Sequence, residues 1–391
     1  MNSAPVLDIK EAIKYFIANA KLQINQEDMA IPYMEGSPGI GKSQFLASEC
    51  KQNGMGFMSM HLSLVPIEEI GGLPIYKEIE FDNKKVTGTE WSKPDIITKI
   101  YELSKNHKEN IVLLDDFHMS SPAHLALGYE MFTERKLRDF KIPNNVAFVL
   151  AGNDSAKSGA KQMFGAIMNR LAVHKVVPNF TQWVNDFAIK NNVNQKIISF
   201  LRNEINRSYF LEEESTNQPW ASPRSWTRFS NMLNTMEKYI KSLTYSDILY
   251  IAYGHVGPQA SSEFISYYEL YSKTEMDKVF SKKTEIVIPS SNNDRYIYGI
   301  AASNEYTNLI MEETKNKEQV IDIACDIIIG IGKTNAEISV AMLKNISDYA
   351  KVLKHRKQLY VGEMFKKIKE KSPDINSKIS ESLDDIVTAT N

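Results

Sequence analysis

The first 178 residues alternate between short apolar runs and longer stretches in which apolar residues recur every three or four positions. The runs have the length of buried strands, and the stretches at residues 8–20 and 121–134 have the spacing of amphipathic helices. Strands that alternate with helices favour a parallel sheet with helices on both faces. We therefore predict an α/β fold whose strands lie at Ala30–Met34, Gly56–Leu64, Asn110–Leu114, Val146–Leu150 and Val173–Val177.

The pattern changes after Pro178, where apolar residues keep a helical spacing and no further strand-like runs occur. A polar break at Pro289–Asp294 separates two parts of this region. We predict an α/β domain at residues 1–178, an all-helical domain at residues 179–285 and a helical C-terminal region at residues 286–391. Its tail after Lys366 is rich in Lys, Ser, Asp and Glu, and we expect it to fray.

Composition narrows the classes of protein that fit this pattern. The formal net charge of −2 gives no global positive field for nucleic acid or anionic membrane, so we expect neither as a partner. Two cysteines, Cys50 and Cys325, are too few for a disulfide framework, and no apolar run approaches the roughly 20 residues that span a bilayer. Residues 1–5 lack the features of a signal peptide. These observations predict a cytoplasmic protein, and the scattered histidines argue against bound zinc.

Residues 36–43 match the pattern G-x-x-x-x-G-K-[ST] in full and lie between a predicted strand and a predicted helix. Such a loop wraps its backbone N–H groups around nucleotide phosphates, its lysine reaches the outer phosphates, and its hydroxyl can bind Mg²⁺. The sequence therefore predicts a nucleoside triphosphate site. The expected contacts are Gly36, Ser37, Pro38, Gly39, Ile40, Gly41, Lys42, Ser43 and Gln44.

Paired aspartates follow the predicted strand Asn110–Leu114. The carboxyl end of a strand in an open α/β sheet is where ligands bind, so we assign Asp115, with Ser43, to Mg²⁺. Asp116 would orient or deprotonate the attacking water, although its side chain is one methylene shorter than the glutamate that is usual at this position. The alternative is that the pair caps a helix N-terminus.

Three further polar residues complete the predicted constellation. Asn153 follows the apolar strand Val146–Leu150 and could contact the γ-phosphate or the attacking water, or it could be an ordinary turn residue. Arg170 precedes the last strand and could stabilise charge on the transferred phosphoryl group, sometimes from a neighbouring subunit, or form a surface ion pair. Arg224 lies at the start of a helix, where a cation opposes the helix dipole unless it faces an anion such as a triphosphate.

Taken in order, these motifs resemble those of AAA+ ATPases of the MoxR-like branch, over roughly residues 8–275. Residues 131–137 resemble the segment after the Walker B helix of this branch, residues 68–74 resemble the stretch before its helix-2 insert, and residues 75–91 could form that hairpin. The resemblance implies a P-loop NTPase fold with a helical lid, ATP and Mg²⁺ as ligands, and Asp116 at the catalytic acid position. It also implies Asn153 as sensor 1, Arg170 as arginine finger and Arg224 as sensor 2.

The same resemblance implies a ring, typically a hexamer, with the site between subunits. It also implies a protein client that is remodelled or activated, often beside a partner with a von Willebrand A domain, and short relatives of this kind are familiar from bacteriophages. Because of Asp116, a nucleotide-gated assembly or scaffold protein with little turnover is the alternative. A DNA-directed motor is a third, less favoured because the net charge is near zero and no nucleic-acid-binding module is obvious. The basic run at residues 351–357 has the apolar neighbours of a packed helix, so we expect it to be the solvated face of that helix.

Overall fold

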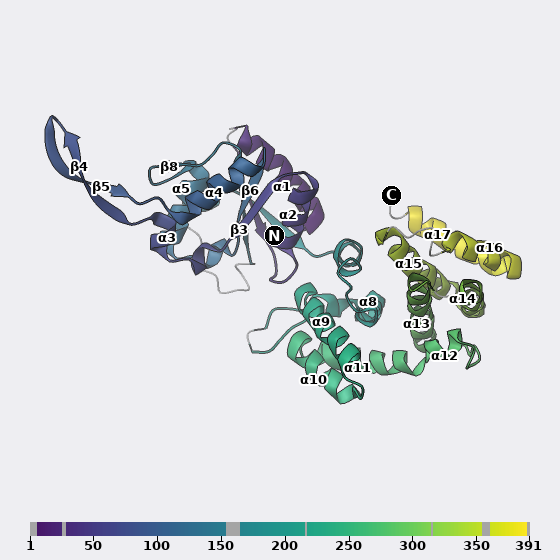
Figure 1. Ribbon diagram of the computed structural model, residues 1–391. Coiled ribbons are helices and arrows are strands. Elements are labelled where there is room, and N and C mark those ends of the chain that lie inside the picture. Colours follow the sequence, from purple (N-terminus) through teal and green to yellow (C-terminus); the bar gives the residue numbers. More distant parts are fainter. Residues whose placement is uncertain are drawn as a thin grey trace. The chain divides into compact units, whose positions relative to one another are not determined.

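A computed structural model describes residues 6–25, 29–153, 165–215, 217–313, 316–353 and 360–388. The chain divides into two compact units, Met1–Asn179 and Phe180–Asn391, which are coloured purple to blue-green and green to yellow in Figure 1. Each unit is described by itself. None of the described helices is long and apolar enough to cross a membrane.

The first unit is built on a six-stranded sheet in which every pair of neighbouring strands is parallel. All five predicted strands are confirmed, and a short sixth strand, which the sequence analysis missed, lies at one edge. In spatial order they are β1 (Val6–Asp8), β10 (Leu171–Val177), β2 (Ile31–Glu35), β9 (Val146–Gly152), β6 (Asn110–Leu114) and β3 (Gly56–Met60).

One predicted strand is shorter than expected. The apolar run that begins at Gly56 was expected to continue to Leu64, but β3 ends at Met60 and Leu62–Leu64 form the 3-10 turn η1. Met60 pairs with Leu114, the last residue of β6, so no ladder partner exists for the residues beyond it. The chain therefore leaves the sheet at His61.

Helices cover both faces of the sheet. Alternate residues of β6 and β9, such as Val112 and Phe148, join an apolar core with α4 (Asp95–Asn106) and α5 (Pro122–Thr133). On α1 (Ile9–Ile24), Gln23 donates to the carbonyl of Phe148 and accepts from its N–H, both at 2.9 Å. These bonds satisfy the backbone N–H and carbonyl of Phe148, since the pairing of β9 with β2 begins only at Leu150. The other helices of this unit are α2 (Lys42–Gln52), α3 (Ile67–Gly71) and α6 (Gly165–Met168).

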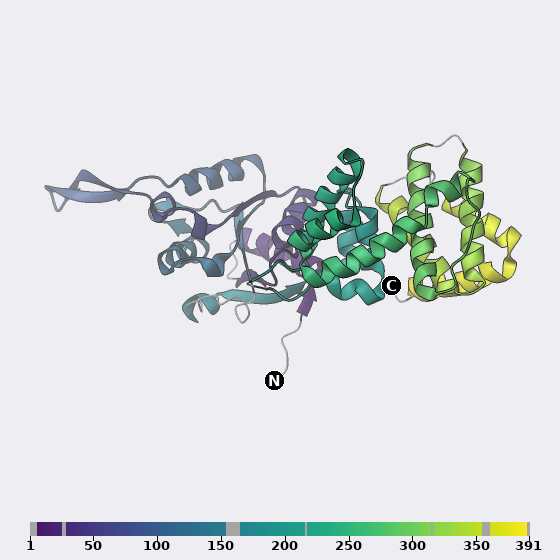
Figure 2. The ribbon, with the colours of Figure 1, turned by 90° about the horizontal axis from the view of Figure 1, so that it is seen from below.

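A hairpin projects from this unit in both views (Figure 1, Figure 2). Its strands β4 (Pro74–Phe81) and β5 (Lys84–Trp91) are antiparallel, which confirms the predicted hairpin. Ile75, Tyr76 and Ile79 are exposed on it. A second, very short hairpin pairs β7 (Lys136–Leu137) with β8 (Phe140–Lys141).

The second unit is helical in all its described parts. One apolar core extends from Phe180 to Ile379 and contains five buried tyrosines, which are Tyr267, Tyr268, Tyr298, Tyr306 and Tyr349. Its elements are α7 (Phe180–Gln182), the π-helical turn η3 (Trp183–Ala188), α8 (Gln195–Arg202), the 3-10 turn η4 (Glu204–Phe210), α9 (Pro223–Tyr239), α10 (Tyr245–Val256), α11 (Pro258–Lys273), α12 (Met276–Phe280), α13 (Asn292–Met311), α14 (Lys317–Gly332), α15 (Ala336–Val352), α16 (Val361–Lys371) and α17 (Pro373–Thr388).

The expectation of a fraying tail was wrong for most of the tail. Ile368, on α16, and Ile375 and Ile379, on α17, are buried in the apolar core, so the polar composition of this segment reflects only its outer face. Of the predicted basic run, Lys351 lies on α15, whereas residues 354–357 lie outside the described residues.

Candidate functional site

The phosphate loop connects β2 to α2 in the geometry that anion binding requires. Gly39 and Gly41 have φ of 80° and 96°, a left-handed conformation that favours glycine. Gly36 admits no side chain, because a Cβ there would lie 2.6 Å from the carbonyl oxygen of Val176. The N-cap residue of α2 is Gly41, which has no side chain that could cap the helix. The first turn of α2 carries no acidic residue. The backbone donors at this helix N-terminus thus lack a side-chain cap, as a phosphate site needs.

Lys42 lies within the loop and is buried. Its Nζ donates to the carbonyl oxygens of Gly36 at 2.7 Å and Ser37 at 3.2 Å, and to Oδ1 of Asn153 at 3.3 Å. The ammonium group therefore lies where the loop curls and already touches the candidate sensor residue. This position fits a lysine that exchanges carbonyl contacts for phosphate oxygens.

The two residues assigned to Mg²⁺ meet. Ser43 Oγ, at the start of α2, donates a hydrogen bond to Oδ2 of Asp115, which follows β6 and is buried. Hydroxyl and carboxylate oxygens suit Mg²⁺, which usually keeps water and phosphate oxygens as its other ligands. In the described parts of the chain, no group of three or more His, Cys, Asp and Glu side chains could hold a metal ion.

Asp116 adopts a left-handed conformation with φ of 47°, and 42% of its side chain is exposed. It precedes the 3-10 turn η2 (Phe117–Met119) but makes no side-chain cap hydrogen bond, so the capping alternative is wrong for this residue. Its Oδ2 lies 3.5 Å from Nδ1 of His61. The Asp115 N–H donates to the carbonyl of Met60, which fixes the end of β6 beside the end of β3.

His61 is one of two histidines at this edge that the sequence analysis missed. The sequence contains a signal for both histidines, because His61 follows the first apolar residues of a predicted strand and His118 lies three positions after Asp115. His118 is buried, and its Nδ1 accepts a hydrogen bond from the Asn153 N–H at 3.4 Å. Burial lowers its pKa and the charge of Lys42 lowers it further, while Asp116, Asp115 and Glu35 oppose the shift.

Asn153 directly follows β9, which lies between β2 and β6 in the sheet. This strand order brings Asn153 between the phosphate loop and the paired aspartates, although it is far from both in sequence. The sheet thus gathers Lys42, Ser43, Asp115, Asp116 and Asn153 at one edge.

Arg170 directly precedes β10, at the opposite end of the strands from the phosphate loop. Its carbonyl oxygen accepts from the N–H of Ile31, the first residue of β2, at 2.8 Å, whereas the phosphate loop follows the last residue of that strand. Five residues at about 3.3 Å each separate the two ends by roughly 16 Å. The Arg170 side chain is exposed and forms no ion pair with a described residue. Within one chain, Arg170 therefore lies away from the phosphate loop.

Arg224 belongs to the helical unit. It follows Ser222 and Pro223, which form the N-cap and first turn of α9, and Ser222 and Ser225 form a capping box. The α9 N-terminus is thus already capped, and Arg224 is exposed beside it.

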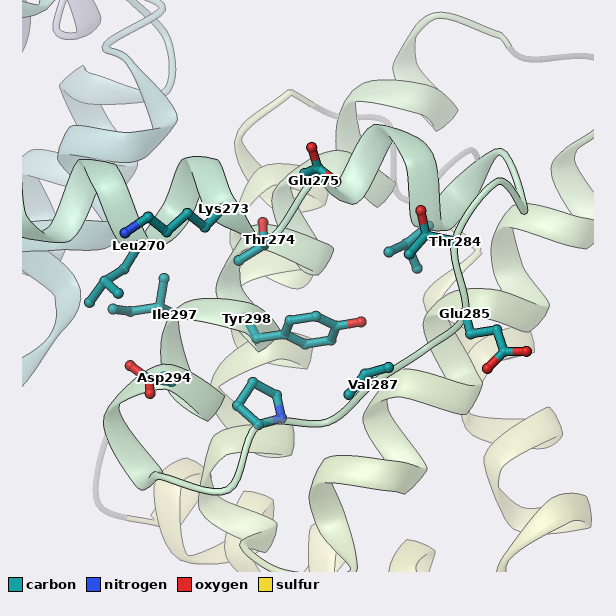
Figure 3. Close-up of a pocket in the computed structure, with 12 residues that line it drawn as sticks. Leu270, Lys273, Thr274, Glu275, Thr284, Glu285, Val287, Asp294, Ile297 and Tyr298 are labelled. Carbon is teal, nitrogen blue, oxygen red and sulfur yellow. The ribbon is translucent and has the colours of Figure 1, made fainter.

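A separate pocket of about 360 Å³ lies within the helical unit, where α11, α12 and α13 meet the segment at residues 284–289. Figure 3 shows Tyr298 reaching from α13 toward this segment, which carries Thr284 and Val287. Of the predicted polar break at Pro289–Asp294, the two end residues Pro289 and Asp294 line this pocket. None of the predicted site residues lines it.

Neither a protein-family model nor a curated protein matches the sequence. Among solved structures, a RuvB mutant from Thermotoga maritima is similar at 12% identity and a TM-score of 0.34, with 70% of this chain and 77% of that chain covered. The T. maritima RuvB Holliday junction branch migration motor gives 14% identity and a TM-score of 0.33, with coverage of 80% and 85%. A candidate ATPase from Cytophaga hutchinsonii gives 12% identity and a TM-score of 0.29, with coverage of 63% and 86%.

The strand order and the phosphate loop themselves define the fold. A six-stranded parallel sheet, covered by helices on both faces, carries a glycine-rich loop between β2 and the N-terminus of α2. The chain therefore has a P-loop NTPase fold followed by a helical C-terminal region.

Proposed function

We propose that this protein is an AAA+ ATPase that binds ATP with Mg²⁺ at the carboxyl edge of its sheet and hydrolyses it within a ring of identical subunits. The meeting of Ser43 and Asp115 carries this proposal. These two residues are 72 positions apart in the sequence, and their oxygens converge beside a helix N-terminus that has no side-chain cap. The strand β9, which leads to Asn153, lies between β2, which leads to the phosphate loop, and β6, which leads to the paired aspartates.

The roles of the residues follow from their chemistry. Bound ATP supplies the phosphoryl group and its leaving group, and Mg²⁺ neutralises charge between the phosphates. Lys42 and the N–H groups of the loop bind the phosphates, while Ser43 and Asp115 hold the metal ion. Asp116, whose carboxylate is partly exposed, orients water or accepts its proton. Asn153 contacts Lys42 and has an amide available for the outermost phosphate.

The position of Arg170 supports the proposed ring of subunits. Its backbone lies at the opposite end of the strands from the phosphate loop, which supports a site that a neighbouring subunit completes with its own Arg170. Contacts between different surfaces of identical subunits close into rings when the rotation permits. We propose that Arg170 acts across such an interface as the arginine finger and that Arg224 reaches the nucleotide as sensor 2. The resemblance to AAA+ ATPases favours six subunits.

A mixing experiment tests this arrangement. Arg170→Ala subunits keep an intact phosphate loop, and Lys42→Ala subunits keep Arg170. We expect each variant alone to lack turnover, and an equal mixture to regain it at about a quarter of its sites, because that fraction combines Lys42 with a neighbour's Arg170. Mass measurement verifies that both variants assemble. A mixed assembly that stays inactive, or full activity in the Arg170→Ala protein, would contradict the mechanism.

A nucleotide-gated assembly protein with little turnover is the second candidate, and the short side chain of Asp116 favours it. If Asp116 lies too far from the attacking water, Asp116→Glu restores the missing reach. We expect this variant to raise turnover by about a hundredfold or more, in the range of general-base effects. Measurement of phosphate release with and without Lys42→Ala as a background control decides the matter. An unchanged low rate in Asp116→Glu counts against this candidate.

We further propose that the protein belongs to the MoxR-like branch and remodels a protein client, with a von Willebrand A domain protein as the expected partner. The hairpin β4–β5 directly after α3 supports this assignment, because it stands where that branch carries its helix-2 insert. A DNA-directed motor is disfavoured by the net charge of −2. Stimulation of turnover by DNA in a salt-sensitive manner would reverse that preference.

A further inference from the structure

His118 is the most buried histidine at the candidate site, with 3% of its surface exposed. The turn η2 directs it there, because the Met119 N–H donates to the carbonyl of Asp116 at 2.9 Å and the chain bends back immediately after the paired aspartates. The imidazole therefore faces the end of β9 and not the solvent. None of the roles proposed above uses this residue.

The hydrogen bond of His118 fixes the ring's tautomer. Nδ1 accepts from the backbone N–H of Asn153, so in the neutral ring the proton is on Nε2. Nε2 is buried and has no hydrogen-bond partner among the described residues. Burial lowers the pKa of the ring, which keeps it neutral and preserves Nδ1 as an acceptor.

Packing around Gly152 shows how tightly the end of β9 is held. A Cβ at Gly152 would lie 2.1 Å from the hydroxyl of Tyr33 and 2.6 Å from Nδ1 of His118. Tyr33 lies on β2, the strand that leads to the phosphate loop, and His118 follows β6, the strand that leads to the aspartates. The end of β9 is thus clamped between groups from its two neighbouring strands.

Two contacts of Asn153 complete a continuous polar path. Its side chain accepts from Lys42 in the phosphate loop, and its backbone donates to His118 in the aspartate turn. The imidazole thus connects the aspartate turn to Asn153, and Asn153 in turn contacts Lys42.

We propose that His118 is a positioning residue that holds Asn153 through Nδ1 and so couples the aspartate turn to the phosphate loop. The proposal rests on the proposed ATPase function for its catalytic consequence, but the hydrogen bond itself exists without nucleotide. His118 does not contact the reacting atoms in this scheme. It sets where the side chain of Asn153 lies relative to Lys42.

Two isosteric variants separate the roles of the ring nitrogens. His118→Asn can place its side-chain oxygen near the position of Nδ1, whereas His118→Gln reaches toward the position of Nε2. We expect Asn153 amide hydrogen exchange, measured by NMR without nucleotide, to stay close to wild type in His118→Asn. In His118→Gln it should accelerate by about tenfold, the effect of losing one net hydrogen bond.

ATP turnover should stay close to wild type in His118→Asn and fall in His118→Gln. The affinity of both variants for a fluorescent ADP analogue should stay within about twofold of wild type, because the phosphate contacts are unchanged. His107→Gln, at an exposed position by the other edge of the sheet, serves as the matched control. If His118→Gln also unfolds the protein, the ¹⁵N shifts of the wild-type ring still test the proposal, which requires the Nε2–H tautomer.

The outcomes separate this inference from the proposed function. Unchanged Asn153 exchange in both variants, or retention by His118→Gln and loss by His118→Asn, would overturn the role of Nδ1 even if ATP turnover is found. Absence of turnover in the wild type would sink the ATPase proposal and leave the exchange result to decide the role of His118.

Discussion

The two units of this chain use polar residues in opposite ways. In the helical unit, buried polar groups bond to one another: Asn345 donates to Ser303 and Asn304, both at 2.8 Å, and Arg202 donates to Asp348 at 2.7 Å. In the α/β unit, polar groups converge at the carboxyl ends of the strands, beside the helix N-terminus at Gly41. Polar groups that bond to one another in the interior help to hold a fold together, whereas polar groups gathered at this end of a parallel sheet lie where ligands bind.

Core packing should affect the helical unit most. Phe264 is fully buried, and its ring lies 5.2 to 5.9 Å from those of Phe200, Trp226 and Phe229. Phe264→Ala should lower the free energy of unfolding by about 3–5 kcal/mol, measured by urea denaturation. Tyr250→Ala, at a position that is 82% exposed, is the control. A loss of less than about 1 kcal/mol would contradict the described core.

Lys42→Ala should have a smaller effect in free energy than Phe264→Ala, and the effect should be on nucleotide affinity and not on stability. Removal of a charge-assisted phosphate contact should weaken nucleotide affinity by roughly 100-fold, measured by titration with a fluorescent analogue. Thermal unfolding should change little. Lys51→Ala, in the last turn of the same helix, should bind normally. Equal affinity in both variants would remove the basis for treating the sheet edge as a nucleotide site.

The smallest expected effect is on pH dependence. Burial lowers the folded-state pKa of His118 and His174 below the ordinary value of 6.5, so both rings are neutral in the fold. As the pH falls through 6.5, the unfolded chain takes up protons first, and the free energy of unfolding decreases. We expect lower stability at about pH 5.5 than at about pH 7.5, and a weaker dependence in His118→Gln. A dependence of opposite sign would show that other groups dominate.

Most of the sheet could be predicted because parallel strands buried on both faces read as continuous apolar runs. The short strand β1 escaped because it has only three residues, of which Val6 is exposed. The C-terminal helices α16 and α17 were misjudged for the reverse reason, since their many charges hid the few isoleucines that pack into the core.

By itself, the sequence determined the phosphate loop, because its glycines, lysine and serine must lie within eight consecutive residues to surround a phosphate. The apolar runs also indicated that Asp115 and Asn153 follow buried strands. Which strands are neighbours became known only from the fold, and this order brings Asn153 into contact with Lys42 and His118 and places Arg170 at the opposite end of the strands. Contacts within a loop depend on local spacing, but contacts between strands depend on pairing that no local pattern encodes.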